Sequence, residues 1–214
     1  MLCGAVSFDR LLCAGCDADL SHYSTPACPI CALPALDANL CGACLRRPPA
    51  FDNTLAAFSY DFPIDRLLHA FKYAGNLALV DVLAQPLARL VEVQPKPDLL
   101  LPMPLHPSRL KERGFNQSLE IAKPISRWLD IPLEACACRR TRDTPTQAGL
   151  KLRERRRNVR GAFACDLDLS GKSVAVLDDV MTTGATLDEI SRALRRSGAT
   201  TISAWVVART AKEA

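Results

Sequence analysis

The strongest constraint on the fold of this chain lies in residues 172–187, which read Lys-Ser-Val-Ala-Val-Leu-Asp-Asp-Val-Met-Thr-Thr-Gly-Ala-Thr-Leu. Residues 174–177 are an unbroken apolar run with the length and β-branched content of a strand buried on both faces. The run ends in two adjacent carboxylates, Asp178 and Asp179. A strand of this kind is typical of a parallel sheet covered by helices, so the segment predicts an α/β fold.

A small-residue loop and a helical pattern follow the two carboxylates. We call residues 182–186 the threonine loop, because three of the five are threonine. Gly184 lets the backbone turn tightly, the hydroxyls can donate hydrogen bonds, and the first amides of a helix point toward its N-terminus. We therefore interpret the loop as an anion site made of Thr182, Thr183, Gly184, Ala185 and Thr186.

A sugar phosphate is the ligand that suits this segment best. The loop lacks the lysine of a nucleotide-binding P-loop, which argues against a nucleoside triphosphate. One phosphate can lie in the loop while Asp178 and Asp179 accept hydrogen bonds from neighbouring sugar hydroxyls. Residues 174–186 resemble the phosphoribosyl pyrophosphate (PRPP) signature of type I phosphoribosyltransferases, an apolar strand with Asp-Asp ahead of Thr-Gly-x-Thr. The alternative is a strand end and a helix cap without a ligand.

The composition favours one main domain with a small addition. The chain has 214 residues, of which 49% are hydrophobic, enough for one good core. Its apolar stretches fall short of the roughly 20 residues that cross a bilayer, and Met1-Leu2-Cys3 has no signal-like region before it. We expect a cytoplasmic protein without a membrane span.

The cysteines are concentrated at the start of the chain. Of ten cysteines, seven lie in the first 44 residues. Six of them form Cys-x-x-Cys pairs, a spacing that lets two thiolates bind one tetrahedral zinc. Such use is expected of metal ligands in a reducing compartment, so residues 1–47 are predicted to be a zinc-binding head. The pairs are Cys13 with Cys16, Cys28 with Cys31, and Cys41 with Cys44.

A 28-residue repeat relates the cysteines to one another. The position that corresponds to Cys28 falls before Met1, so we infer a double zinc knuckle whose first copy lacks one ligand. Either the true start lies upstream or the ligand has been lost. The shift maps Cys3 onto Cys31, Cys13 onto Cys41 and Cys16 onto Cys44.

Two zinc sites follow from this repeat. The complete one would consist of Cys28, Cys31, Cys41 and Cys44. The other would consist of Cys3, Cys13 and Cys16, a set that His22 can complete. Two alternatives stay open: pairing of Cys13 and Cys16 with Cys28 and Cys31, and reduced buried cysteines without metal.

The main domain is predicted to cover residues 51–214. Pro48 and Pro49 stiffen the connection from the head and mark a domain boundary. We expect a strand over 54–60, helices over 64–73 and 77–93, a strand from Leu99, a helix from Gln117 capped by Asn116, and a last strand over 200–208.

A basic loop follows the strand that begins at Leu99. In this strand, loop and helix order, the loop would lie at the carboxyl edge of a parallel sheet, where α/β folds bind ligands. It would place three cations there, Arg109, Lys111 and Arg113.

The next segment is strongly basic and has little regular period. Residues 106–160 carry 14 Lys plus Arg against 6 Asp plus Glu, a net charge of +8, while the rest of the chain has −4. We interpret residues 139–163 as a long loop. A solvated surface is the simplest interpretation of such charges. The other is single-stranded DNA binding, with Phe115 as a stacking face and the phosphate backbone held by Arg153, Arg156, Arg157 and Arg160.

Taken together, the motifs resemble the ComF family. They are Pro102-Met103-Pro104, residues 113–117 (Arg-Gly-Phe-Asn-Gln), the pattern over 147–158 and the PRPP signature, in this order behind paired zinc knuckles. The resemblance implies a phosphoribosyltransferase-like domain with a zinc head, in a family linked to DNA uptake in competence and to the use of DNA as a nutrient. The incomplete first cysteine copy departs from the family pattern.

The resemblance also implies roles for the site residues. The ligand would be PRPP or a ribose 5-phosphate, with Asp178 and Asp179 on the ribose hydroxyls and the threonine loop on the 5′-phosphate. Arg109, Lys111 and Arg113 would bind the pyrophosphate together with Mg²⁺. Three functions remain: a pentosyl transferase, a PRPP-sensing or DNA-handling protein, and a scaffold whose zinc head binds a partner such as a DNA-uptake protein.

Overall fold

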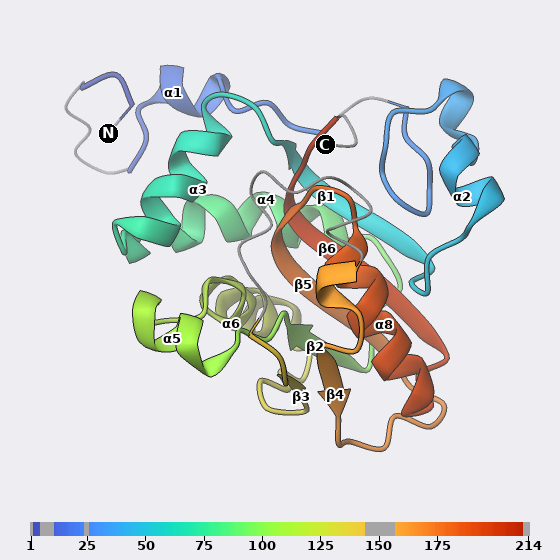
Figure 1. The fold of residues 1–214 in the computed structure, drawn as a ribbon. Helices are drawn as coiled ribbons and strands as arrows, with labels where there is room; N and C mark the ends of the chain where they lie inside the picture. The colour runs from blue at the N-terminus through green and yellow to red at the C-terminus, as the bar shows by residue number, and fades with distance from the viewer. Residues whose placement is uncertain (1, 5–10, 24–25, 144–156, 212–214) are drawn as a thin grey trace.

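The core of the protein is a parallel four-stranded sheet (Figure 1). The computed structural model describes residues 2–4, 11–23, 26–143 and 157–211. The strand order is β1-β6-β5-β2, and every neighbouring pair is parallel. The predicted α/β fold with a parallel sheet is therefore confirmed. The strands are β1 (Asn53–Ser59), β6 (Thr201–Arg209), β5 (Ser173–Met181) and β2 (Leu99–Pro102).

Helices cover both faces of the sheet, which explains the unbroken apolar run in β5. On one face, Ala175 and Leu177 lie in a core with α3 (Ile64–Tyr73), α4 (Val80–Glu92) and α6 (Gln117–Leu129). On the other face, Val174 and Val176 pack with α8 (Ala185–Arg196). Successive side chains of a strand point to opposite faces, so two apolar faces require apolar residues at every position.

Local sequence features set the start of α6 and the end of the helix that precedes it. The Asn116 carboxamide accepts hydrogen bonds from the Ser118 and Leu119 amides, which confirms Asn116 as the cap of α6. Ahead of it lies α5 (Pro107–Arg113), which ends at Gly114 with a φ of 81°. A 3-10 turn, η2 (Leu77–Leu79), precedes α4 where one continuous helix was expected.

The expected long loop over residues 139–163 is wrong at its two ends. They pair as an antiparallel ribbon of β3 (Cys138–Arg140) and β4 (Phe163–Cys165). Cys138 and Phe163 are buried in the α8 side of the core, which anchors the ribbon. Three-residue strands are too short to show a period in the sequence.

The two halves of the cysteine-rich head pack on opposite faces of the sheet. Near α1 (Ala14–Ala18), Cys16 joins the core of the α3 side, together with Leu12 and Leu20. Cys28, Cys31 and Cys44 join the α8 side. Figure 1 shows this separation, with α1 beside α3 and α2 (Gly42–Arg46) on the other side of the molecule. A short turn, η1 (Leu36–Ala38), lies between them in sequence.

The head also covers the edge of the sheet at β1. The Tyr23 amide donates to the Ala57 carbonyl at 3.0 Å, and the Ser59 amide donates to the Ser21 carbonyl at 2.9 Å. An uncovered edge strand presents unpaired backbone groups that invite pairing with other chains. The head therefore supplies hydrogen-bond partners along part of the β1 edge.

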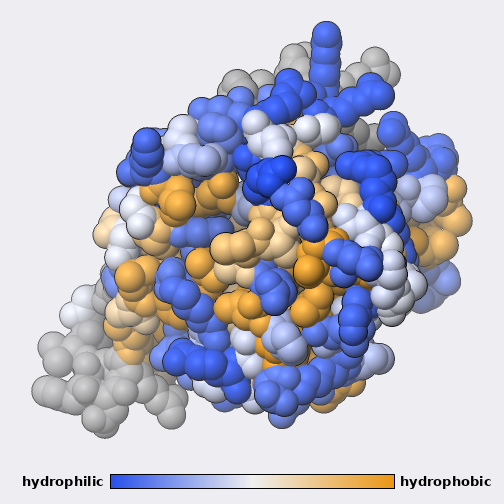
Figure 2. Space-filling view, turned by 90° about the horizontal axis from the view of Figure 1, so that it is seen from below, coloured by the Kyte–Doolittle hydropathy of each residue, from blue (hydrophilic) through white to orange (hydrophobic). Residues whose placement is uncertain are grey.

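The exposed surface mixes residue types. On the face shown in Figure 2, hydrophobic residues are interspersed with hydrophilic ones. Within the described ranges, every helix is too short or too polar to span a membrane.

Candidate functional site

The centre of the candidate site is the pair of carboxylates in β5, which continues past them to Met181 instead of ending at Leu177 as the apolar run suggested. Asp179 is 4% exposed, and its Oδ2 lies 2.6 Å from Nζ of Lys72, at the end of α3. Burial alone would lower the pKa of Lys72, but the Asp179 carboxylate holds it above its ordinary value. Lys72 therefore stays charged, and its contact with Asp179 connects α3 to β5.

Asp178 is the half-buried member of the pair. Its Oδ1 accepts hydrogen bonds from Ser118 Oγ at 3.2 Å and from the Asp179 amide at 2.9 Å. Burial raises the pKa of Asp178, the Asp179 charge raises it further and Lys72 opposes the rise, leaving a value of about 7. The ionised form is thus only partly compensated in the free protein.

A cavity of about 210 Å³ opens beside Asp178. Its lining includes Lys72, Tyr73, Ser118 and Thr186 as well as three guanidinium groups. Two of these groups come from α5 and one comes from β3 of the ribbon, and all three line the same cavity as the Asp178 carboxylate. They are Arg109, Arg113 and Arg140.

Two further residues of the cavity, Arg140 and Gln117, indicate what kind of ligand it can bind. Burial lowers the pKa of Arg140, and Arg109 lowers it further, whereas the Asp178 carboxylate opposes the shift. Gln117 is 6% exposed and lines the cavity, and its Oε1 has no hydrogen-bond partner among the described residues. A buried acceptor without a partner is costly, so this wall suits a ligand that donates hydrogen bonds.

The structure distributes the threonine loop between two spaces. Thr186 lines the cavity, whereas Thr183, Gly184 and Ala185 line a space of about 50 Å³ on the side of the head. Gly184 has a φ of 73°, and a Cβ there would lie 2.7 Å from Met181 Cε. The positive φ is what favours glycine here, since the nearby methyl group ends a flexible side chain that can move aside.

Several residues predicted for the sites lie differently from expectation, and Asp179 and Thr182 do not line the cavity. Lys111 is exposed on α5 and is absent from the cavity lining, because Arg109 and Arg113, two residues away on either side, occupy the inward face. Phe115 is half-buried and its ring packs on Phe71 at 5.5 Å, so it does not offer the exposed stacking face that was considered.

The proposed nucleic-acid residues are only partly described. Arg157 and Arg160 are exposed. Near them, Arg142 Nη1 donates to the Arg160 carbonyl at 2.8 Å. Arg153 and Arg156 lie outside the described residues.

The second cysteine group, Cys28, Cys31, Cys41 and Cys44, fits a zinc ion. Its sulfur atoms all lie within 4.8 Å of one another. Tetrahedral zinc with Zn–S bonds near 2.3 Å requires sulfur separations of about 3.8 Å. Burial raises the pKa of Cys28, but the amides of Cys41, Cys31 and Ile30 more than offset this and lower it to about 7. The surroundings of Cys28 therefore favour the thiolate that zinc needs, whereas burial raises the pKa of Cys31 to about 11 and also raises the pKa of Cys44.

The first cysteine group, Cys3, Cys13 and Cys16, is also assembled. The three sulfur atoms lie within 4.8 Å of one another, and Cys3 Sγ is 3.6 Å from Cys13 Sγ. The suggestion that His22 completes this site is wrong, because His22 is not in the group and its ring stacks on Phe58 at 5.1 Å. The alternative pairing of the knuckles does not occur either.

Lys72 and Ser118 are site residues that the sequence analysis missed. Lys72 ends an amphipathic helix and Ser118 opens another, both common surface positions. Ser118 lies 60 residues from Asp178 in the chain. One signal was available, because Ser118 directly follows residues 113–117, which are part of the resemblance to the ComF family.

Family models match both parts of the chain. Residues 1–45 match the double zinc ribbon domain, and residues 116–214 match the phosphoribosyl transferase domain. The expected phosphoribosyltransferase-like domain with a zinc-binding head is therefore confirmed at the level of these two modules.

Known relatives match over most of their length. The chain is 38% identical over 190 residues to the DNA utilization protein YhgH of Escherichia coli O157:H7, covering 86% of this chain and 84% of the relative. It is 34% identical over 208 residues to competence protein F of Haemophilus influenzae, covering 92% and 90%. Among solved structures, a glutamine PRPP amidotransferase from B. subtilis aligns at 24% identity and a TM-score of 0.42, covering 61% of this chain and 26% of that one.

We expect protein purified without chelator to carry at least one zinc ion per chain. Cys28→Ser or Cys44→Ser should lower the content by about one ion and promote aggregation, because both thiols lie in the complete group. Metal analysis is the measurement, with Cys136→Ser, an exposed cysteine outside both groups, as control. Unchanged zinc in both variants would contradict the assignment.

A pH dependence should follow from Asp178. A carboxyl whose folded pKa is about 7 binds more protons in the folded than in the unfolded state, so its contribution to stability falls as pH rises from about 4 to 7. Asp178→Asn should remove this fall and gain on the order of 1 kcal/mol over wild type across that range. Urea unfolding at both pH values is the measurement.

Asp98→Asn is a control for which the opposite dependence of stability on pH is expected. Hydrogen bonds from Ser173 lower the pKa of Asp98, so its carboxylate stabilises the fold above the unfolded pKa. Loss of that carboxylate should therefore cost more as pH rises. Equal pH profiles for wild type and Asp178→Asn would contradict the raised pKa.

Proposed function

The chain belongs to the family of competence protein F and the YhgH DNA utilization proteins, and from this we propose that its cavity binds PRPP with Mg²⁺. The observation that carries the proposal is the distribution of charge around the cavity. Asp178 is at the end of β5, and Arg109, Arg113 and Arg140 line the same space. PRPP pairs a hydroxyl-bearing ribose with an anionic pyrophosphate, so it complements both groups.

Asp178 and Asp179 would bind the two ribose hydroxyls. Lys72 neutralises Asp179 and fixes its position, while Asp178 keeps a carboxylate that the free protein compensates poorly. Hydroxyl donors would stabilise that carboxylate, since hydrogen bonds to charged groups are stronger than neutral ones. Gln117 Oε1 offers a further acceptor in the same wall.

The threonine loop would hold the 5′-phosphate at the start of α8. Gly184 places the first turn of α8 directly after β5, and a helix N-terminus favours negative charge. Thr186 lines the cavity from this side. Arg109 and Arg113 would bind the pyrophosphate, as arginine suits bidentate contacts with phosphate.

The family match and the charge distribution also support pentosyl transfer as the reaction. In such a transfer the bond between the ribose anomeric carbon and pyrophosphate breaks, and an acceptor nucleophile forms the new bond there. Guanidinium groups would stabilise the charge that develops on the leaving pyrophosphate. Mg²⁺, when bound, would supply further positive charge to the same oxygens.

Calorimetry should detect PRPP binding in the presence of Mg²⁺. Asp178→Asn should weaken it about tenfold or more, because a charged hydrogen bond contributes roughly 1.5 to 3 kcal/mol. Arg109→Ala should weaken PRPP binding more than Lys111→Ala, since Arg109 lines the cavity and Lys111 does not.

Asp168→Asn, an exposed carboxylate before β5, is the matched control. Absence of heat and of thermal shift for wild type at millimolar PRPP would remove the proposal. Pyrophosphate release screened across bases and nucleotides would then identify an acceptor or, if none works, favour a sensing role.

Single-stranded DNA binding is the second candidate function. It is favoured by the basic residues around the ribbon, where Arg140 faces the cavity and Arg139, Arg157 and Arg160 are exposed. Phosphate contacts of this kind bind nucleic acid without reading sequence. The names of two relatives, a DNA utilization protein and a competence protein, agree with this candidate.

Fluorescence anisotropy with a short oligonucleotide should show binding that weakens steeply with salt. Arg157→Glu with Arg160→Glu should reduce affinity at low salt, whereas Lys96→Glu, on an exposed ion pair elsewhere, should not. Competition by PRPP would place DNA beside the cavity. No binding at low salt would eliminate this candidate.

A further inference from the structure

The last strand ends in a buried cation, Arg209. Its side chain is 1% exposed, and its register partners are Ser59 of β1 and Met181 of β5. It therefore sits at the carboxyl edge of the sheet, below the threonine loop. A buried guanidinium is tolerated only when its donors are satisfied.

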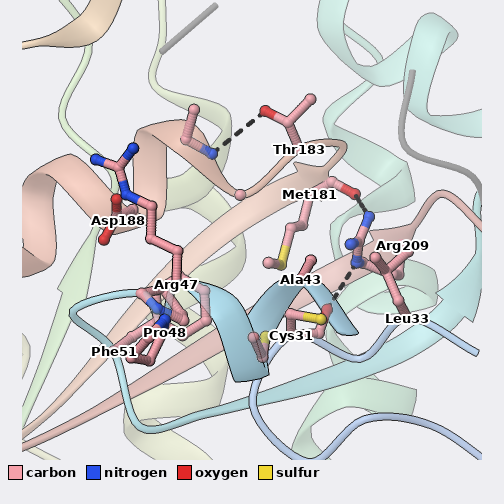
Figure 3. A pocket seen from close by; sticks show the side chains of 14 residues that line it. Cys31, Leu33, Ala43, Arg47, Pro48, Phe51, Met181, Thr183, Asp188 and Arg209 are labelled. Carbon is pink, nitrogen blue, oxygen red and sulfur yellow. Dashed lines mark hydrogen bonds between the residues drawn. The ribbon is translucent and has the colours of Figure 1, made fainter. Parts of the chain in front are cut away.

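Arg209 donates to carbonyl groups from three separate segments. Its Nε donates to the Cys31 carbonyl at 2.9 Å. Its Nη1 donates to the Met181 carbonyl at 3.0 Å and also to the Thr182 carbonyl, and to the Thr210 carbonyl at 3.0 Å. Figure 3 shows the side chain between Cys31 and Met181.

Two of these acceptors belong to different parts of the molecule, the second cysteine group and the threonine loop. Cys31 is a member of the second cysteine group, and Thr182 is the first residue of the threonine loop. Arg209 thus forms a direct polar connection from the zinc knuckle to the loop. A space of about 50 Å³ is lined by residues of both the knuckle and the loop.

A second set of contacts also connects the zinc knuckle to the end of β5. Thr54 Oγ1 donates to the Ile30 carbonyl at 2.7 Å, one residue before Cys31, and lies 3.9 Å from Met181 Sδ. Met181 in turn fills the space beneath Gly184, where a Cβ would be 2.7 Å from its Cε. The knuckle backbone, Met181 and the loop are therefore packed as one unit.

We propose that Arg209 is a positioning residue that makes the threonine loop depend on the zinc knuckle, so that loss of zinc from the second cysteine group weakens PRPP binding. The proposal rests on the proposed function of the cavity. Zinc fixes the turn that contains Cys31, and hence the direction of its carbonyl. When that turn is released, Arg209 loses an acceptor and the Thr182 carbonyl loses a fixed donor.

Arg209→Lys is the main variant, because it keeps the charge but replaces the planar set of donors that reaches several carbonyls. Cys41→Ser removes a half-buried zinc ligand. Each should raise the Kd for PRPP tenfold or more by calorimetry, with Arg127→Lys, an exposed arginine on α6, as matched control.

The double variant separates positioning from general destabilisation. If both changes act through the same connection, Arg209→Lys should add less than threefold to the effect of Cys41→Ser. Independent effects would multiply instead. Zinc content should stay at the wild-type level in Arg209→Lys. Wild-type PRPP affinity in either single variant, or multiplied effects in the double variant, would overturn the proposal.

Hydrogen exchange tests the connection without PRPP. The amides of residues 182–186 should exchange at least tenfold faster in Arg209→Lys and in Cys41→Ser, while those of β2 remain protected. If wild type binds no PRPP but this loss of protection occurs, the function of the cavity is wrong and the connection stands. Unchanged protection in both variants would refute the connection itself.

Discussion

The structure depends on how two adjacent carboxylates are accommodated at the end of a buried strand. Like charges this close destabilise each other and raise the pKa of one member. Lys72 compensates Asp179 from α3, whereas Asp178 relies on Ser118 and one backbone amide. Asp178 is left with a pKa of about 7. The arrangement leaves Asp179 paired with Lys72 and Asp178 on the wall of the cavity.

The same carboxyl edge brings the remaining parts of the molecule together. α3 supplies Lys72, α5 supplies Arg109 and Arg113, and the ribbon supplies Arg140. Below the edge, Arg209 extends the connection to the zinc knuckle. The cysteine-rich head is therefore more than an appendage, since its two halves pack on opposite faces of the sheet and cover the β1 edge.

The two cysteine groups differ in how they are integrated. The second has four ligands and joins the core next to the threonine loop, through Cys28, Cys31 and Cys44. The first has three described ligands, among them an exposed Cys3, and meets the α3 side through Cys16. The second group is thus the one that lies beside the threonine loop.

Sequence alone determined the features that are local in the chain. The strand, carboxylates, glycine turn and helix of residues 174–196 are contiguous, and the cysteine repeat predicted the two groups, although the other pairing of the knuckles stayed open until the structure brought Cys28, Cys31, Cys41 and Cys44 together. Tertiary structure decided what depends on distant partners. Lys72 meets Asp179 across the fold, Arg209 reaches Cys31, His22 stacks on Phe58, and Lys111 faces solvent. Such contacts leave no period or motif, since they are set by how helices and strands pack after they form.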